Sequence, residues 1–324
     1  MNIGVIGCGA YSLALGLKLK ENSNNITIWS ENEEKIKIIK EKNMLNTALP
    51  HVILPEEFNY TTDIQNAAIG MDIIFVVVSI PYIESTMVKL KEFITDDTVV
   101  CLASKGIDAD SNKFVHEIVD SVVKIKNLAI ISGPGFAIDL AKNNPVGLSV
   151  AGRNANCIEL VKKSFTSSTL NLVATTDFIG LEICGSIKNV IAIGAGILNG
   201  MGYSESTVSY FLTDAINETK NLIKILGGDE KTILTYGGIG DIILTSLSSK
   251  SRNYTLGTLI GRNENKKVID NYLVENTVEG YFTLKSLCKI TINKNIEIEL
   301  INILFDIIIN KDNPQILIEY LANK

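Results

Sequence analysis

The chain has 324 residues, of which 46% are hydrophobic, so two domains with buried sheets and helices are expected. A formal net charge of −6 and the lack of a basic tract argue against a nucleic-acid partner, because binding to phosphates needs a cationic surface. Five cysteines without a C-x-x-C motif are typical of reduced thiols inside a cell.

The first twenty residues predict the first half of a dinucleotide-binding βαβ unit. Residues 3–6 form an apolar run, Gly7-Cys8-Gly9-Ala10-Tyr11-Ser12 follows, and residues 13–20 favour a helix. Gly7 permits a tight turn, and Gly9 lets the main chain approach a pyrophosphate. Ser12 occupies the third position of the G-x-G-x-x-G motif. No charged segment of a signal peptide precedes this strand, so we expect a cytoplasmic protein.

An acidic residue follows the second predicted strand at the distance expected for a nucleotide site. Residues 26–29 form that strand, and Glu31 stands where a carboxylate accepts hydrogen bonds from ribose hydroxyls. A G-x-G triplet alone is weak evidence, and the alternative is an ordinary structural turn. The context of strand, turn, helix and strand favours nucleotide binding.

Strands and helices alternate up to residue 174. The predicted strands are 3–6, 26–29, 73–78, 99–103, 128–131, 146–151 and 170–174. Helices are expected over 31–42, from 64, over 87–93, from Asp110-Ser111 and over 157–165. This alternation predicts a Rossmann-type, doubly wound, mainly parallel sheet in a domain of residues 1–178.

Helical spacing prevails from residue 179, so residues 179–324 are predicted to form an all-α domain. The expected helices are 181–198, 206–226, 242–247, 254–260, 278–287, 296–309 and 314–321. The longest charge-free stretch, 189–204, is too short and too rich in Gly and Asn to span a bilayer. We therefore expect no membrane span.

Reduction of a carbonyl by hydride needs a proton donor beside the oxygen. The two histidines, His51 and His116, lie in a Pro-flanked loop and an apparent surface helix, and a solvated or structural role outweighs catalysis for both. Lys188 is the best candidate, because a lysine within an apolar helix needs a partner to be buried. The alternative is a lysine whose ammonium reaches solvent along the helix surface.

A second cluster follows the glycines at 237–240. Asp241 stands at a helix start with Thr245 one turn later, although Asp241 alone is equally a helix cap. Arg252 and Asn253 offer donors to a phosphate, although a single arginine is more often a plain surface residue.

Taken together, these motifs resemble those of the bacterial NAD(P)-dependent sn-glycerol-3-phosphate dehydrogenases over nearly the whole chain. The matching stretches are 7–11, 104–107, 132–137, 187–193, 240–245, 251–253 and 278–280. The resemblance implies reduction of dihydroxyacetone phosphate to glycerol 3-phosphate for phospholipid synthesis, and a homodimer. Two alternatives stay open: a related dehydrogenase for another small keto substrate, and a catalytically silent nucleotide-binding sensor.

The resemblance also implies roles for individual residues, with no metal. Catalysis is expected from Lys188, which protonates the C2 oxygen, and from Lys105, Asp241 and Thr245. Substrate binding is expected from Lys105, Gly133, Asn189, Ser251, Arg252 and Asn253. Cofactor binding is expected from Gly7, Gly9, Ala10, Tyr11, Ser12, Glu31, Pro81, Lys105, Ala137, Arg252 and Glu279.

This chain departs from the family pattern near the cofactor. Glu31 stands where the family often has arginine, so we expect NAD(H) to be preferred over NADP(H), because a carboxylate repels a 2′-phosphate. Ser12 and Leu13 replace the usual Gly-Thr, which is expected to loosen or shift the cofactor. Gly135 and Ile138-Asp139 replace Ser and Lys-Glu in a loop expected near the active site, which is expected to alter rate or affinity.

Overall fold

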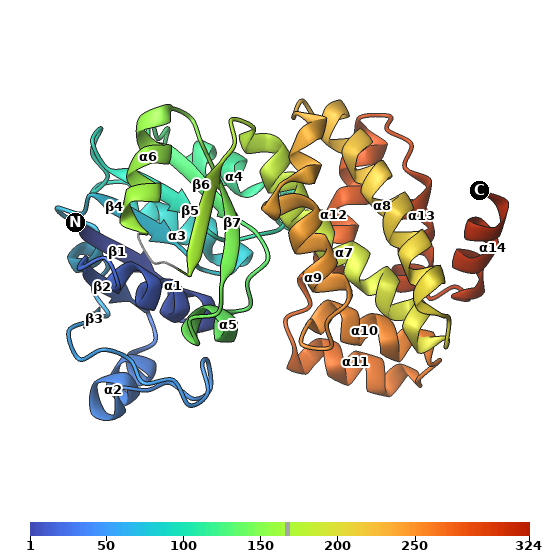
Figure 1. Ribbon diagram of the computed structural model, residues 1–324, viewed down its shortest axis with the longest axis horizontal. Coiled ribbons are helices and arrows are strands. Elements are labelled where there is room, and N and C mark those ends of the chain that lie inside the picture. The colour runs from blue at the N-terminus through green and yellow to red at the C-terminus, as the bar shows by residue number, and fades with distance from the viewer. Residues whose placement is uncertain (166–168) are drawn as a thin grey trace. The chain divides into compact units, whose positions relative to one another are not determined.

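The computed structural model describes residues 1–165 and 169–324, which divide into two compact units (Figure 1). Unit 1 contains residues 1–104 and 115–178, and unit 2 contains residues 105–114 and 179–324. Residues 105–114 fall within the predicted first domain of residues 1–178, whereas their contacts place them in unit 2. Lys105 therefore belongs to the same unit as Lys188 and Asp241.

Unit 1 is built on one eight-stranded sheet in the order β3-β2-β1-β4-β5-β6-β7-β8. The strands are β1 (Asn2–Ile6), β2 (Asn25–Trp29), β3 (Asn59–Thr61), β4 (Ile73–Val76), β5 (Val99–Leu102), β6 (Leu128–Ser132), β7 (Val146–Gly152) and β8 (Leu170–Ala174). All neighbours pair in parallel except β6 and β7, which are antiparallel. The predicted mainly parallel, doubly wound sheet is confirmed.

The central strands are apolar because both faces of the sheet are covered. Every residue of β4 is buried, and Val5 of β1 lies opposite Phe75 in the parallel register. The backbone N–H of Gly7 donates to the carbonyl of Trp29 at 3.0 Å, so the ends of β1 and β2 stay side by side. The predicted turn at Gly7 and the acidic residue after β2 thus lie at one edge of the sheet.

Helices of unit 1 occupy the connections between the strands. They are α1 (Ala10–Lys20), α2 (Glu33–Lys42), α3 (Ile83–Leu90), α4 (Val115–Val122), α5 (Ala137–Ala141) and α6 (Ala155–Ser164), with short 3₁₀ turns η1 (Ile64–Ala67) and η2 (Ile80–Tyr82). The helix expected from Asp110-Ser111 begins only at Val115. The Asp108 carboxylate accepts from the backbone N–H and hydroxyl of Ser111 at 2.8 and 2.7 Å, which holds this segment in a turn.

All secondary structure described between residues 179 and 324 is helical, which confirms the predicted all-α part. The helices are α7 (Phe178–Gly200), α8 (Glu205–Ile225), α9 (Asp241–Ser246), α10 (Arg252–Gly261), α11 (Lys266–Glu275), α12 (Glu279–Asn293), α13 (Glu299–Phe305) and α14 (Gln315–Asn323). A 3₁₀ turn, η3 (Glu230–Leu234), and two π-helical turns, η4 (Tyr236–Gly240) and η5 (Asp306–Asn310), interrupt them. The single helix expected over 296–309 is α13 followed by η5.

Helix α7 is the centre of the unit 2 core. By length and composition it is long and apolar enough to cross a membrane, but 94% of its apolar window is buried inside the protein. Such burial is typical of the core helix of a soluble protein. Phe211 of α8 and Leu304 of α13 pack against Gly194 of this helix, where an added Cβ would lie 2.4 Å from the Phe211 ring.

Glycines let α7 and α10 pack with their backbones in contact. A Cβ added to Gly196 would lie 2.1 Å from the carbonyl oxygen of Tyr254, and one added to Gly257 would lie 2.0 Å from that of Ile193. Gly200 and Gly261 repeat the contact one turn further along each helix. The contact fixes the first turn of α10, with Arg252 and Asn253, against the middle of α7.

All five cysteines are free and buried: Cys8, Cys101, Cys157, Cys184 and Cys288. Burial raises the pKa of the Cys8 thiol to about 11 and that of Cys288 to about 12. These two thiols are therefore protonated at neutral pH and act as packing groups.

Candidate functional site

Two lysines of unit 2 share one buried carboxylate. Lys188 of α7 donates to Oδ1 of Asp241 at 2.7 Å, and Lys105 donates to Oδ2 at 2.7 Å. The side chains of Lys188 and Lys105 are 12% and 14% exposed, and that of Asp241 is 2% exposed. Two ammonium groups on one carboxylate leave a formal charge of +1, so the cluster favours an anionic ligand.

The environment brings Lys188 close to the range in which a proton donor works at neutral pH. Burial lowers the pKa of Lys188 to about 8, while Asp241 raises it and Lys105 lowers it. For Asp241, burial raises the pKa, but Lys105 and Lys188 outweigh this effect and hold it below its usual value. The carboxylate therefore stays ionised beside an ammonium group of reduced pKa.

The backbone before Asp241 is shaped by glycine. Gly238 lies in η4 with φ −91° and ψ −110°, and an added Cβ would lie 2.3 Å from the carbonyl oxygen of Ile233. This turn runs directly into α9, whose first residue is Asp241. The Thr245 hydroxyl donates to the Asp241 carbonyl at 2.7 Å and lies 3.4 Å from Oδ1.

A chain of hydrogen bonds joins the neighbours of Lys188 and Arg252. The Asn189 amide donates to Glu279 Oε2 at 3.1 Å, and the Asn253 amide donates to Asn189 Oδ1 at 3.0 Å. The backbone N–H of Gly280 completes it by donating to Asn253 Oδ1 at 2.8 Å. The resemblance assigned Asn189 and Asn253 to the substrate and Glu279 to the cofactor. These three residues hold one another in place across α7, α10 and α12.

Arg252 is the first residue of α10 and is exposed. Its guanidinium makes no ion pair within residues 1–165 and 169–324, so its donors face solvent. Ser251 caps the helix, because its hydroxyl accepts from the backbone N–H of Tyr254 at 3.3 Å. The predicted phosphate-binding role therefore fits Arg252 better than Ser251, which is already engaged.

Unit 1 has a cavity of about 360 Å³ at the ends of β1, β2 and β4. Gly7, Gly9 and Glu31 line it. Gly7 has φ +123°, and an added Cβ would lie 2.8 Å from the carbonyl oxygen of Val77. A Cβ added to Gly9 would meet no atom within 4 Å, so the chain leaves open space there. These features fit a dinucleotide whose pyrophosphate approaches the first turn of α1.

Ser12 is accommodated by hydrogen bonding. It is 1% exposed, and its hydroxyl accepts from the Gly9 N–H at 3.3 Å and lies 3.5 Å from the carbonyl oxygen of Val77. The serine therefore links the glycine turn to the end of β4. Ala10 and Tyr11 precede it in the first turn of α1.

The remaining candidate residues of unit 1 lie in short helices and loops. Pro81 lies in η2, and Ala137 begins α5. Gly133 packs closely against β7, since an added Cβ would lie 2.9 Å from Leu148. His51 is exposed in a turn, and His116 lies in α4 with its ring 5.7 Å from that of Phe178, so neither contributes to the lysine cluster.

Two further lysines in unit 1 were not singled out by the sequence. Lys18 of α1 is fully buried and donates to Glu21 at 2.9 Å, Asn143 at 2.5 Å and Thr169 at 2.8 Å. Lys89 of α3 donates to Glu31 at 2.6 Å. The burial of Lys18 could have been suspected only from its position among apolar residues in the last turn of α1. No sequence pattern pointed to the contact of Lys89 with Glu31.

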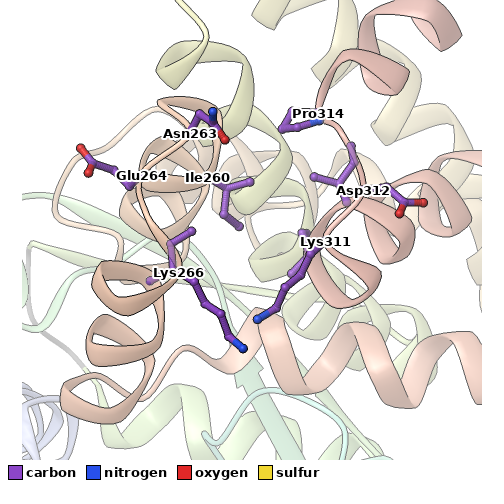
Figure 2. Close-up of a pocket in the computed structure, with 10 residues that line it drawn as sticks. Ile260, Asn263, Glu264, Lys266, Lys311, Asp312 and Pro314 are labelled. Carbon is purple, nitrogen blue, oxygen red and sulfur yellow. The ribbon is translucent and has the colours of Figure 1, made fainter.

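Unit 2 also contains a cavity of about 200 Å³ that none of the predicted residues lines (Figure 2). Ile260 lines it, and the side chains of Lys266 and Lys311, which also line it, extend toward one another in Figure 2. Lys311 lies 3.7 Å from Asp270. Because the lysine–aspartate cluster lies elsewhere in unit 2, this cavity is not the candidate active site.

Both parts of the chain match family models. The N-terminal model of NAD-dependent glycerol-3-phosphate dehydrogenase matches residues 2–158, and its C-terminal model matches residues 177–319. A glycerol-3-phosphate dehydrogenase [NAD(P)+] of Fusobacterium nucleatum is 32% identical over 93% of this chain and 90% of its own length. The corresponding protein of Leptospira biflexa is 29% identical over 100% of this chain and 98% of its own length.

Solved structures agree with this match. The crystal structure of glycerol-3-phosphate dehydrogenase from Coxiella burnetii has a TM-score of 0.92 and 25% identity, covering 100% of this chain and 99% of that one. D-mandelate dehydrogenase with NADH and a 2-dehydropantoate 2-reductase of Enterococcus faecalis reach TM-scores of only 0.62 and 0.53, at 15% and 13% identity. The last two share the fold alone.

Proposed function

Since the chain belongs to the NAD-dependent glycerol-3-phosphate dehydrogenase family, we propose that it interconverts dihydroxyacetone phosphate and sn-glycerol 3-phosphate. The observation that carries this proposal is the pair of lysines on Asp241. A cationic cluster suits a phosphorylated keto substrate, and an ammonium with a pKa of about 8 suits proton transfer to its carbonyl oxygen. The product would supply the backbone of glycerophospholipids.

In this mechanism Lys188 donates a proton to the C2 oxygen during reduction and accepts it during oxidation. Asp241 accepts one N–H of Lys188, which orients the remaining N–H groups, and it holds Lys105 beside the same oxygen. The Thr245 hydroxyl supports the backbone of Asp241. When bound, the reduced nicotinamide supplies the hydride.

Binding of the phosphate is assigned to Arg252, whose exposed guanidinium offers a fork of donors. The amides of Asn189 and Asn253 keep that end of α10 in register with α7, so they act chiefly as positioning residues. Glu279 helps to position Asn189 by accepting a hydrogen bond from its amide.

We propose that the cofactor binds at the cavity lined by Gly7, Gly9 and Glu31, with NADH preferred over NADPH. The preference is supported by Glu31, which follows β2 and lines this cavity, because a carboxylate there would accept from ribose hydroxyls and repel a 2′-phosphate. A Glu31→Arg variant should shift the preference toward NADPH, and an unchanged ratio of kcat/KM values would contradict the assignment. The resemblance implies a homodimer, which light scattering after size exclusion tests, and a cytoplasmic location is expected from the sequence.

The reaction is tested by following NADH absorbance with dihydroxyacetone phosphate, pyruvate and ketopantoate in turn. We expect decay only with the first substrate. Lys188→Ala should abolish turnover while NADH still binds, and Lys224→Ala, a control at a 73% exposed lysine of unit 2, should retain turnover. NADH binding without any substrate-dependent decay would favour the silent nucleotide sensor. Decay with a keto acid alone would favour the related dehydrogenase.

A further inference from the structure

We infer that Lys89 is a specificity-determining residue that sets how well the chain accepts a 2′-phosphorylated cofactor. The inference rests on the proposed nicotinamide-dependent function and adds to it a residue outside the glycine motif. Lys89 lies on α3, while the residue that it contacts, Glu31, follows β2.

The geometry places an ammonium group at the carboxylate expected to meet the ribose. Lys89 Nζ lies 2.6 Å from Glu31 Oε1 and 5.9 Å from the centre of the Trp29 ring. Ser85, one turn before Lys89 on the same face of α3, lines the cavity together with Glu31. Lys35 of α2 lines it as well. The cavity that Glu31 lines therefore also carries a lysine from α2, besides the Lys89 ammonium bound to Glu31.

The ion pair of Lys89 and Glu31 is exposed to solvent, so little free energy is needed to separate it. The side chains of Glu31 and Lys89 are 73% and 43% exposed, and ion pairs in such surroundings are weak because water competes with them. A 2′-phosphate carries more negative charge than a carboxylate and offers several acceptors. Lys89 can therefore exchange Glu31 for the phosphate at little cost.

With a free 2′-hydroxyl the same pair acts differently. Glu31 accepts from the hydroxyl while Lys89 stays bound to the other side of the carboxylate. Glu31 thus favours NADH, and Lys89 limits that preference by neutralising the carboxylate and by supplying a partner for the phosphate. Removal of Lys89 alone leaves Glu31 to repel the phosphate.

Equilibrium titration of NADH and NADPH tests the inference without requiring turnover. Lys89→Met should weaken NADPH binding relative to NADH by about tenfold, the loss expected for one charge-assisted hydrogen bond. Glu31→Gln should raise relative NADPH affinity. Lys37→Met removes an equal charge from a 75% exposed position on α2 and should leave the ratio unchanged. The effect of Lys89→Met should shrink at high salt, since exposed charges are screened.

The outcomes separate this inference from the proposed reaction. If the ratio of NADPH affinity to NADH affinity is the same in Lys89→Met as in Lys37→Met, the proposed role of Lys89 is overturned, whatever the turnover. A lower relative affinity for NADPH in Lys89→Met, in a protein that reduces no dihydroxyacetone phosphate, would support the role of Lys89 and overturn the proposed reaction instead. If Lys89→Met unfolds, Lys89→Gln provides the same loss of charge with a hydrogen-bonding side chain.

Discussion

Replacement of Asp241 by asparagine removes the one charge that Lys105 and Lys188 share. The side chain keeps its size, but it loses the negative charge that opposes the effect of burial on Lys188. Lys188 is then buried beside another ammonium group, and Glu279 is the remaining carboxylate that raises its pKa. The pKa of Lys188 should therefore be lower in the variant than in the native protein.

The size of this effect follows from replacing a charged acceptor by a neutral amide oxygen. Lys188 donates to Asp241 at 2.7 Å, and a hydrogen bond to a charged group contributes about 1.5–3 kcal/mol. Because one pKa unit corresponds to about 1.4 kcal/mol, the midpoint of the pH profile should move down by roughly one to two pH units. Both lysines also lose the buried carboxylate that they share, so the free energy of unfolding should fall by about 3–5 kcal/mol.

The assay is the pH dependence of kcat/KM in both directions of the reaction. Reduction needs the protonated amine, so its rate should fall as pH rises through about 8 in the native protein and at lower pH in Asp241→Asn. Oxidation needs the neutral amine, so its rate should rise over the same ranges. Glu230→Gln, at a 40% exposed carboxylate, is the control. Equal midpoints in Asp241→Asn and the control, with folded protein by circular dichroism, would refute the reasoning.

Three further changes probe the surroundings of the site. Arg252→Ala should raise KM for dihydroxyacetone phosphate by a factor corresponding to about 1.5–3 kcal/mol, because one charged hydrogen bond is lost; unchanged saturation kinetics would refute its assignment to the phosphate. Gly257→Ala places a Cβ 2.0 Å from the Ile193 carbonyl oxygen, so α10 must move; denaturant titration should show a loss of about 1–3 kcal/mol together with a higher KM, and a native KM would show that this contact does not position Arg252. Lys18→Met leaves the acceptors on Asn143 and Thr169 without their donor and should cost about 1–3 kcal/mol of stability; a loss no larger than that of Lys37→Met would argue against this network.

Most of the fold could be predicted because burial determines residue choice along its strands and helices. The apolar run at 73–76, rich in β-branched residues, favours a covered strand, and α7 is apolar nearly throughout. Elements with weak patterns were missed. β3 has three residues without an apolar run, and α11 contains no buried residue, so its periodicity carries little signal.

The sequence indicates which residues belong to the candidate site better than it indicates which of them contact one another. Lys188 could be singled out because an apolar helix makes a charge conspicuous, whereas its sharing of Asp241 with Lys105 depends on a tertiary contact between residues 136 positions apart. Likewise, Asn189 and Asn253 are recognisable as polar residues in a helical region, but their mutual hydrogen bond is set by the approach of α7 and α10. The assigned roles themselves stay predictions until the variants are measured.

The five buried thiols give this protein a practical advantage. Because alkylating reagents attack the exposed thiolate, the native protein should resist labelling, and its rate of modification should report how often the packed interior opens. A single cysteine introduced on the surface would then carry a fluorophore or spin label without prior removal of the natural ones. With one such label in each unit, the distance between the two labels could be measured at each stage of the catalytic cycle.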